Sequence, residues 1–240
     1  MGDDAPRKSL LSNAAILYHK EKGNIIIEPF NELNLGTASY DVALGPYHYR
    51  ERNPAGRPNL LNPFDEASVR AIWNLHEAPT RRELEKSQGI QFGKGIGLDD
   101  QVILLAPGET VLGHTLEYIG GRNCIETKMQ ARSSIGRNFI AVCKCAGWGD
   151  VGFINRWTME ITNMAQHYWI PLVVGRRVAQ IAFFEVDPIN AGSDYAQSGG
   201  KYQASLSLEE LKRDWTPDAM LPKMWKDREV RGVDDGESRS

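Results

Sequence analysis

The fold is decided by residues 101–131, which read QVILLAPGETVLGHTLEYIGGRNCIETKMQA. Short apolar runs in this stretch are separated by turn residues such as Pro107 and Gly108, a pattern typical of consecutive β-strands. The same texture continues to residue 186 with little helix between the runs, which favours an antiparallel sandwich or barrel over a strand–helix–strand fold. The predicted strands are Val102–Leu105, Thr110–Ile119, Cys124–Ala131, Phe139–Ala146, Phe153–Asn163, Trp169–Val174 and Val178–Val186.

Shorter elements lie on both sides of this β region. Ser12 is placed to cap a short helix that ends near Gly23, and β-like runs follow at residues 25–27 and 40–44. Residues 50–95 are rich in Pro, Arg and Asn and contain one helical pattern near residues 69–75, so we interpret them as an insertion. A possible capping box, Ser207 with Glu210, begins a short helix near the C-terminus.

These patterns predict one domain over residues 1–206, with an insertion at about 50–95, followed by a C-terminal helix and a flexible tail over 207–240. The chain has 240 residues, with 28 Lys and Arg against 31 Asp and Glu, and this net charge of −3 excludes a generically basic nucleic-acid binder. It contains no apolar run of the ~20 residues that span a bilayer. We therefore expect a soluble, cytoplasmic protein that binds neither nucleic acid nor membranes directly.

Three cysteines without a Cys-x-x-Cys pair predict neither a disulfide framework nor a structural zinc site. Cys143 and Cys145 alternate along a predicted strand, so we expect them to form a packed pair of thiols on one face. Two other motifs are weak. The glycines at positions 93, 95 and 97 lack the strand and helix of a phosphate-binding loop and indicate a flexible turn, and His19-x-Glu21 indicates a surface residue of the first helix.

A stronger signal is the run Ala131-Arg132-Ser133-Ser134-Ile135-Gly136-Arg137 between two predicted strands. Two hydroxyls, two guanidinium groups and backbone N–H groups freed by a turn at Gly136 supply the donors and positive charge that a polyphosphate needs. From these residues alone, a solvated turn is about equally favoured.

The second strong signal is Glu160, an acid that interrupts the apolar alternation of Trp157, Met159 and Ile161. A turn carrying one further acid, Asp150, precedes it. A carboxylate on a strand beside a phosphate-binding turn is a candidate general acid or base. An ion pair between Glu160 and an arginine is an equally good interpretation of the pattern alone.

Seven motifs in order resemble the dCTP deaminase branch of the trimeric dUTPase superfamily over about residues 9–203, the insertion excluded. They are Ile26-Ile27-Glu28-Pro29-Phe30, Ala38-Ser39-Tyr40-Asp41-Val42, Pro107-Gly108-Glu109-Thr110-Val111-Leu112-Gly113, Arg132-Ser133-Ser134-Ile135-Gly136-Arg137, Ala146-Gly147 with Asp150 and Gly152, Met159-Glu160-Ile161-Thr162-Asn163 and Gly200-Lys201-Tyr202-Gln203.

The resemblance implies a mainly all-β fold, a distorted antiparallel β-barrel of the jelly-roll-like β-clip type with a few short helices. It also implies a homotrimer with active sites across the subunit contacts. By this resemblance the triphosphate of dCTP or dUTP is bound together with Mg²⁺, and the protein itself supplies no metal ligand. The residues that match phosphate and sugar contacts are Arg132, Ser133, Ser134, Asp150, Tyr195 and Lys201.

The implied chemistry is a metal-free hydrolytic deamination at C4 of cytosine. Glu160 matches the glutamate that moves the protons, and the carbonyl of Ala146 helps to hold the water. Ser133 and Arg137 match residues that position the water and the glutamate and stabilise charge. Plain dUTPases carry an apolar residue in place of Glu160, so the resemblance favours a deaminase that forms dUTP.

Three alternatives stay open at this point. Asp150 matches the position where dUTPases activate water, which suits a bifunctional deaminase and diphosphatase that releases dUMP. The loop Ala146–Phe153 departs from the family pattern at Trp148, Gly149 and Val151, so a modified or differently phosphorylated deoxycytidine nucleotide is also a candidate substrate. The third alternative is a non-catalytic nucleotide sensor that binds a partner through the insertion and the C-terminal helix. The glutamine that the family carries near Ser205, a phosphate contact, is missing.

Overall fold

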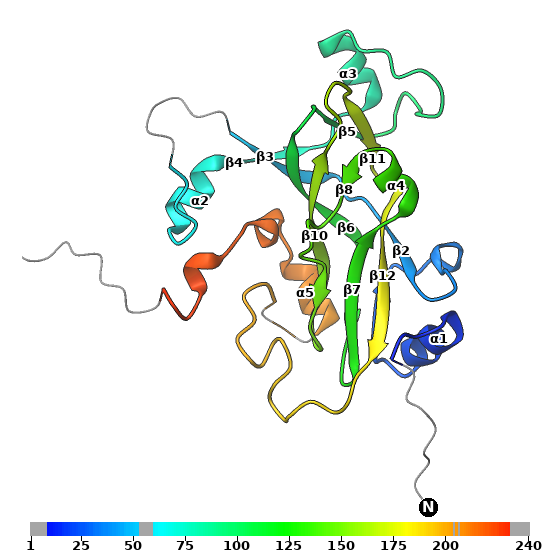
Figure 1. Ribbon diagram of the computed structural model, residues 1–240, viewed down its shortest axis with the longest axis vertical. Coiled ribbons are helices and arrows are strands. Elements are labelled where there is room, and N and C mark those ends of the chain that lie inside the picture. Colours follow the sequence, from blue (N-terminus) through cyan, green and yellow to red (C-terminus); the bar gives the residue numbers. More distant parts are fainter. Residues whose placement is uncertain (1–8, 53–59, 204, 206, 231–240) are drawn as a thin grey trace, which may run out of the picture.

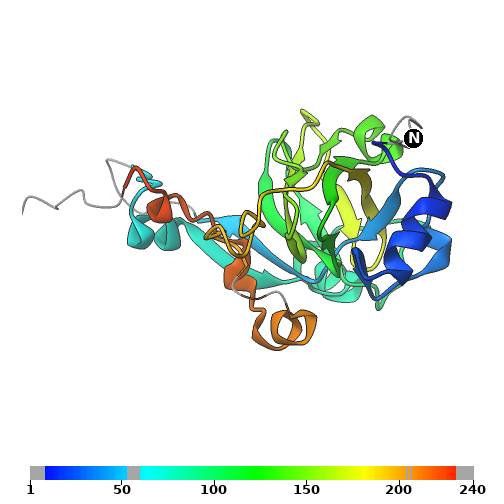
Figure 2. The ribbon, with the colours of Figure 1, turned by 90° about the horizontal axis from the view of Figure 1, so that it is seen from below.

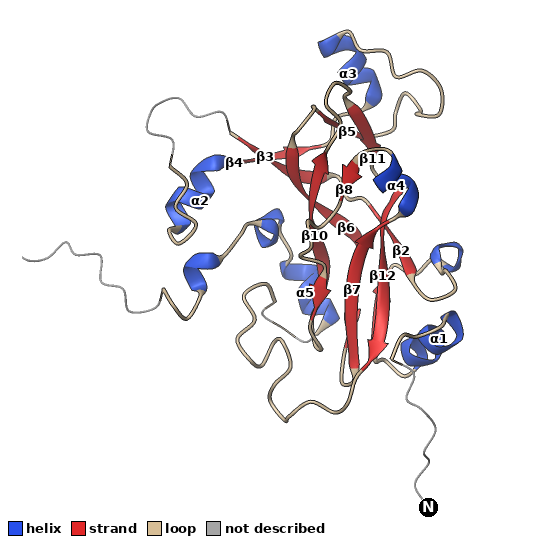
Figure 3. Ribbon diagram, in the orientation of Figure 1, coloured by secondary structure: helices blue, strands red, loops and turns tan. Residues whose placement is uncertain are grey.

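The computed structural model describes residues 9–52, 60–203, 205 and 207–230, and this part of the chain is built mainly from antiparallel strands (Figures 1 and 3). The strands are β1 (Ile25–Glu28), β2 (Tyr40–Ala43), β3 (Tyr47–Glu51), β4 (Trp73–Glu77), β5 (Val102–Leu105), β6 (Thr110–Gly121), β7 (Ile125–Ala131), β8 (Ile140–Ala141), β9 (Trp148–Gly149), β10 (Ile154–Asn163), β11 (Ile170–Val173) and β12 (Arg177–Glu185). The helices are α1 (Asn13–Glu21), α2 (Glu66–Ile72), α3 (Arg81–Gln88), α4 (Ser133–Arg137) and α5 (Leu208–Asp214), with 3-10 turns η1 (Glu32–Asn34), η2 (Pro217–Met220) and η3 (Met224–Lys226).

Strand β6 organises the largest sheet. It pairs with β10 along most of its length, with β1 near one end and with β3 near the other, which gives the order β4-β3-β6-β10-β8 with β1 also attached to β6. A second sheet has the order β2-β12-β7-β9, and β5 pairs with β11. The predicted all-β class and antiparallel pairing are confirmed. In the described part of the chain, the sheets do not close into one barrel.

The hydrophobic core fills the space between these sheets, because one face of each strand is apolar. In β7, for example, Ile125, Thr127 and Met129 are buried and alternate with more exposed residues. Tyr40, Met159 and Phe183 are among the largest fully buried side chains. None of the described helices is long and apolar enough to cross a membrane.

The local predictions for the N-terminal helix are partly confirmed. α1 begins after Ser12, whose hydroxyl accepts a hydrogen bond from the backbone N–H of Ala15, and Gly23 follows the helix with a φ of 75°. His19 was predicted at the surface, and this is wrong: it is 8% exposed, and its Nδ1 lies 3.2 Å from Nδ2 of Asn24. The ring of Tyr18 also packs edge-on against the imidazole, with 5.3 Å between ring centroids.

Two predictions between residues 131 and 146 are also wrong. The Arg132–Arg137 run forms the short helix α4 instead of an open turn. The predicted strand Phe139–Ala146 is reduced to the two residues of β8, because Cys143, Lys144 and Cys145 have left-handed φ angles of 66°, 34° and 74°. Cys143 is consequently buried against Sδ of Met129, whereas Cys145 is exposed, and the two thiols form no pair.

The insertion packs against the C-terminal segment, residues 207–230. The insertion extends the largest sheet by β4, which pairs antiparallel with β3, and Met220 and Leu221 pack with Tyr49, Leu112 and Trp73. Asp218 accepts hydrogen bonds from Tyr49 and from Arg70 of α2. Figure 2 shows the red end of this segment alongside α2, away from α1. Residues 53–59 and 231–240, which include part of the predicted tail, lie outside the described residues, and the domain division stays a prediction.

Two buried histidines, His48 and His114, are expected to make the folded protein less stable in mild acid. Burial lowers the pKa of His48 to about 3 and that of His114 to about 4, and the charge of Arg50 or Arg156 adds to the effect. Between pH 6.5 and these values the unfolded chain binds more protons than the folded one, so the free energy of unfolding falls as the pH falls.

From pH 7 to pH 5 we expect these two side chains to lower the free energy of unfolding by about 3–4 kcal/mol. Urea unfolding at a series of pH values measures the slope. His48→Gln removes one of the two groups and should reduce this slope by about half. An equal slope in both proteins would contradict the assignment.

Candidate active site

The largest sheet, the loop before β10 and the C-terminal segment enclose a cavity of about 770 Å³, which we call the main cavity. Strands β6 and β10 form its floor with Thr110, Leu112, Thr158 and Glu160. The insertion adds Glu51 and Trp73, and the C-terminal segment adds Ala219, Met220 and Pro222. The remaining lining residues are Lys144, Ala146, Trp148, Asp150, Phe153, Asn155, Arg156, Trp157, Tyr195, Lys201 and Tyr202.

Glu160 lies on the floor of the main cavity because its position in β10 puts it opposite Leu112 of β6, on the face of the sheet away from the core residues Met159 and Ile161. Its Oε2 atom is buried and has no hydrogen-bond partner among the described residues. The alternative interpretation, an ion pair with an arginine, is therefore not found. Burial raises the pKa of Glu160, and its own backbone N–H and the charge of Lys144 partly offset this rise. Such a carboxylate is poised to accept a proton.

Lys144 provides the positive charge that lowers the pKa of Glu160. Its Nζ donates a 2.9 Å hydrogen bond to Oγ1 of Thr110, which lies 2.8 Å from Oγ1 of Thr162. Thr110 and Thr162 are opposite one another, two residues along the ladder from the pair formed by Leu112 and Glu160. The ammonium group thus stands beside the carboxylate on the same cavity wall, where an opposite charge favours the ionised acid.

Replacing Lys144 with methionine is expected to raise the pKa of Glu160 further, because the ionised carboxylate loses its nearby positive charge. The substitution leaves the other ionisable groups around Glu160 in place: Glu51, Asp150 and Arg156 in the main cavity and the buried thiol of Cys143. A ¹³C NMR titration of the Glu160 carboxyl group measures the shift. Lys144→Arg keeps the charge and should preserve the wild-type value, and an unchanged or lower pKa in Lys144→Met would contradict this role.

The loop between β8 and β10 brings Ala146 and Asp150 to the main cavity. The left-handed backbone of residues 143–145 turns the chain sharply before Ala146, a conformation that costs energy in residues other than glycine. Gly147 then passes so close to β7 that an added Cβ would lie 2.2 Å from the carbonyl oxygen of Met129. β9 follows, with Gly149 paired to Thr127. Asp150 and Trp148 are exposed, so both are open to a ligand.

Aromatic and basic side chains line the other end of the main cavity. Phe153 packs edge-on against Tyr195, with 5.1 Å between ring centroids, and the hydroxyl of Tyr195 accepts a hydrogen bond from the backbone N–H of Tyr202. Lys201 reaches the cavity beside Tyr202, and its Nζ forms an ion pair with Asp227 of the C-terminal segment. Tyr195 and Lys201, predicted from sequence to contact the nucleotide, therefore share one cavity with Glu160.

The predicted residues of α4 do not reach the main cavity on the same chain. Ser133, Ser134 and Arg137 are exposed on a helix that follows β7. Arg132 precedes this helix and forms a 3.0 Å ion pair with Asp41 of β2. The structure therefore brings together Glu160, Ala146, Asp150, Tyr195 and Lys201. The other four predicted site residues lie on a separate surface: Arg132, Ser133, Ser134 and Arg137.

Several residues of the main cavity were not predicted from the sequence. Lys144 lies in a segment predicted as a strand, and Glu51 and Trp73 belong to the insertion. Met220 and Pro222 come from the region beyond the predicted C-terminal helix. None of them stands in a motif, because their positions depend on contacts between segments far apart in the sequence. In the described part of the chain, no group of three or more His, Cys, Asp or Glu residues could hold a metal ion.

A mainly β fold that places the buried Oε2 atom of Glu160 in a polar and aromatic cavity is suited to general acid–base chemistry. The family model described as dCTP deaminase-like matches residues 10–186, about three quarters of the chain. The protein belongs to this dCTP deaminase-like family, as the sequence motifs predicted.

Related proteins align over most of their length. The dCTP deaminase, dUMP-forming, of Nanoarchaeum equitans is 28% identical over 210 residues, covering 86% of this chain and 99% of that protein. The corresponding protein of Hydrogenobaculum sp. is 29% identical and covers 75% and 84%. The dCTP deaminase of Haloarcula marismortui is 29% identical and covers 85% and 94%.

A solved structure shares the fold. The 2′-deoxycytidine 5′-triphosphate deaminase from Agrobacterium tumefaciens superimposes with a TM-score of 0.52 at 16% identity. The match covers 80% of this chain and 54% of that longer chain. At this identity the likeness concerns the fold alone.

Proposed function

We propose that the protein is a bifunctional enzyme that deaminates dCTP by hydrolysis and releases dUMP. The observation that carries this proposal is the buried Oε2 of Glu160, which has no partner among the described residues and lies in one cavity with Asp150. Two of the relatives above are named as dUMP-forming, which favours the bifunctional alternative over a plain dUTP-forming enzyme. The family membership makes dCTP the first substrate to test.

In the first step Glu160 acts as general base and then as general acid. It takes a proton from water as the water oxygen bonds to C4 of cytosine, and it delivers that proton to N3. Glu160 next moves the proton of the new C4 hydroxyl group to the amino nitrogen. The bond between C4 and that nitrogen then breaks, ammonia leaves, and the C4 carbonyl of uracil remains. Burial raises the pKa of Glu160 above that of an exposed glutamate, which suits a group that both accepts and donates protons.

The backbone carbonyl of Ala146 is assigned to the same water, because the left-handed turn before it brings this residue to the cavity wall. A water held by one carbonyl and one carboxylate is oriented before the reaction, which lowers the entropic part of the barrier. Deamination in this scheme uses no metal ion.

In the second step Asp150 activates a water that attacks the α-phosphorus of dUTP. The bond between the α-phosphorus and the bridging oxygen breaks, and pyrophosphate leaves with dUMP as the other product. Mg²⁺ enters as part of the substrate, bound to the phosphates, a common arrangement for nucleotide triphosphates. Tyr195 packs against Phe153 near the sugar, and Lys201 provides positive charge for the phosphates.

We further propose that three copies of the chain assemble so that α4 of one subunit completes the main cavity of the next. The exposed positions of Ser133, Ser134 and Arg137 support this arrangement. Phe139 beside α4 is 57% exposed, and Met164, whose backbone N–H bonds to the carbonyl of Phe139, is 64% exposed. Exposed apolar residues around a functional helix are typical of an interface. In the trimer Ser133 and Arg137 position the water and the carboxylate, while Arg132 and Ser134 bind phosphate.

Product analysis tests the proposed function. The purified protein is incubated with Mg²⁺ and dCTP, and the products are identified by mass spectrometry alongside an ammonia assay. We expect ammonia, dUMP and pyrophosphate. Accumulation of dUTP without pyrophosphate would reduce the function to deamination alone. Absence of turnover with dCTP, dCDP, dCMP and 5-methyl-dCTP would favour the nucleotide sensor.

A further inference from the structure

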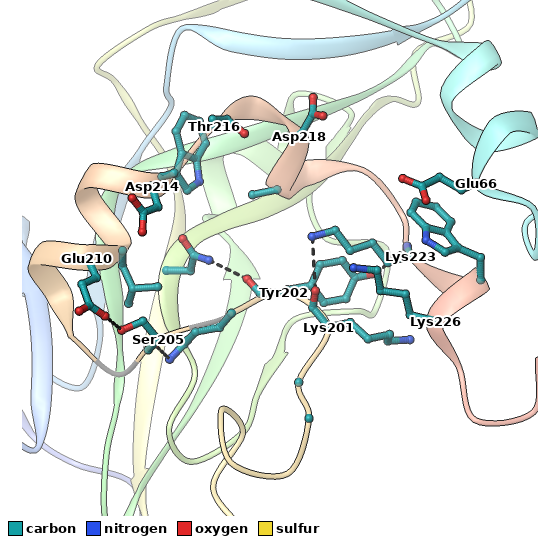
Figure 4. A pocket seen from close by; sticks show the side chains of 18 of the residues that line it. Glu66, Lys201, Tyr202, Ser205, Glu210, Asp214, Thr216, Asp218, Lys223 and Lys226 are labelled. Carbon is teal, nitrogen blue, oxygen red and sulfur yellow. Dashed lines mark hydrogen bonds between the residues drawn. The ribbon is translucent and has the colours of Figure 1, made fainter. Parts of the chain in front are cut away.

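A second cavity of about 480 Å³, which we call the lysine cavity, adjoins the main cavity and shares Asn155, Lys201, Tyr202 and Ala219 with it. Its outer wall is the C-terminal segment, which contributes Lys223 and Lys226. Figure 4 shows these two lysines and Lys201 gathered around the ring of Tyr202. The lysine cavity therefore begins where the proposed nucleotide site ends.

Lys201 and Lys223 both approach the ring of Tyr202, and the charge of Lys226 acts on Lys223. The Nζ atoms of Lys201 and Lys223 stand 5.9 Å and 5.3 Å from the centroid of the Tyr202 ring, and Nζ of Lys223 donates to the carbonyl of Lys201 at 3.3 Å. The backbone N–H of Lys223 also bonds to the hydroxyl of Tyr202 at 3.2 Å. Burial lowers the pKa of Lys223, and the charge of Lys226 lowers it further, so the ligand-free arrangement is electrostatically unfavourable.

Acids offset the charge of these lysines only in part, because the acids that line the lysine cavity have other partners: Glu66, Glu210, Asp214 and Asp218. Among the acids, Asp218 has the largest effect on the pKa of Lys223. Its two carboxylate oxygens already accept hydrogen bonds from Tyr49 and Arg70. Glu66, which also borders the lysine cavity, is paired with Arg70. Only Asp227 reaches a lysine of the cluster among the described ion pairs, and it contacts Lys201. The indole Nε1 of Trp225 is a further buried donor without a partner in the described chain.

We propose that Lys223 is a phosphate-binding residue that, with Lys201, holds the terminal phosphates of the nucleoside triphosphate in the lysine cavity. The inference rests on the proposed function for the identity of the nucleotide, but the anion site itself does not. It assigns to the C-terminal segment the phosphate contact that the family makes with a glutamine near position 205, where this chain has Ser205. Asp227 then occupies the place of a phosphate oxygen on Lys201 until the nucleotide arrives.

The proposal predicts a loss of affinity that depends on the number of phosphates. Removing a charged donor from a phosphate weakens binding by about tenfold or more. We therefore expect Lys223→Met to weaken binding of Mg²⁺-tripolyphosphate and of dCTP by about tenfold, with little change for dCMP, which lacks the terminal phosphates. Isothermal titration calorimetry at one fixed ionic strength measures all three ligands, with Glu160→Gln in the background so that dCTP is not consumed.

Lys212→Met is the matched control, because Lys212 is an exposed lysine of α5 that lies outside both cavities and pairs with Glu209. It should bind all three ligands as the parent protein does. Lys223→Arg should restore most of the affinity for tripolyphosphate. Asp227→Asn should bind tripolyphosphate more tightly than the parent protein, since the competing carboxylate is gone, and this test stands even where Lys223→Met is unstable.

Several results would overturn the inference: no tripolyphosphate binding to the parent protein, equal affinity in Lys223→Met, or an equal loss for dCMP and dCTP. An unchanged or weaker affinity in Asp227→Asn would do the same. The proposed function fails separately, through absence of ammonia release from dCTP, and tripolyphosphate binding that depends on Lys223 would survive that failure.

Discussion

Replacing Glu160 with glutamine is expected to lower the rate of ammonia release from dCTP by about 10²–10⁴-fold while leaving nucleotide affinity nearly unchanged. The amide keeps the size of the side chain but accepts no proton from water and carries none to N3. Measured by stopped assays for ammonia and by calorimetry for binding, the change should appear in kcat and hardly in KM. Retention of more than a tenth of the wild-type rate would remove Glu160 from the mechanism.

Although Glu160→Gln should lose activity, it is expected to be more stable than the wild type at high pH. Burial raises the pKa of Glu160, so the ionised carboxylate is less favourable in the folded protein than in the unfolded chain. The contribution is favourable at low pH and is lost as the pH rises through the folded pKa. Glu160→Gln should therefore melt at a higher temperature than the wild type at pH 8, and this difference should vanish near pH 4. Loss of activity together with gained stability is typical of a site built for chemistry.

Glu126→Gln is the matched control for both measurements. Glu126 is a partly buried glutamate of β7 whose pKa is also raised by burial, but it does not line the main cavity. Its replacement should leave ammonia release at the wild-type rate. An equal loss of activity in the two variants would indicate a general effect of removing a carboxylate from these sheets.

The second large effect concerns two inactive variants that restore one another. Glu160→Gln disables the main cavity of a subunit, and Arg137→Met disables the α4 that we assign to the neighbouring site. Each protein alone should release ammonia at a small fraction of the wild-type rate. Co-refolded in equal amounts, random trimers contain sites with both wild-type residues, and about a quarter of the wild-type activity is expected.

A mixture of Glu160→Gln with Lys201→Met provides the control, because both residues belong to the cavity of the same chain. This mixture should show no more than the average of the two preparations. Failure of the Arg137 and Glu160 mixture to exceed its average would place α4 outside the active site. Mass measurement by light scattering establishes whether the proteins assemble as trimers in each case.

The strands were predictable because their signal is local. Val102–Leu105 is a buried apolar run, and β10 alternates apolar and polar residues so regularly that Glu160 stands out. Each prediction needs only neighbours along the chain, because strand side chains alternate between faces every second residue. The same periodicity identified Glu160 as a candidate for the site before any fold was known.

Predictions failed where distant segments decide the conformation. Residues 143–145 have the composition of a strand, but the approach of Gly147 to Met129 and the burial of the Cys143 thiol impose a left-handed backbone. His19 lies on a helix too short and too polar to show its buried face in the sequence. Neighbouring residues in the sequence do not predict the contacts that bury these residues.

By itself the sequence determined the β class, the family and the carboxylate at position 160, since periodicity and ordered motifs are properties of the chain. Only the tertiary structure decided which residues share the main cavity, and it separated Glu160 from α4. It also joined Tyr49 to Asp218 and brought Lys223 beside Lys201. The physical reason is that such contacts join segments up to 169 residues apart, and their geometry is fixed by packing of the whole core instead of by local preference.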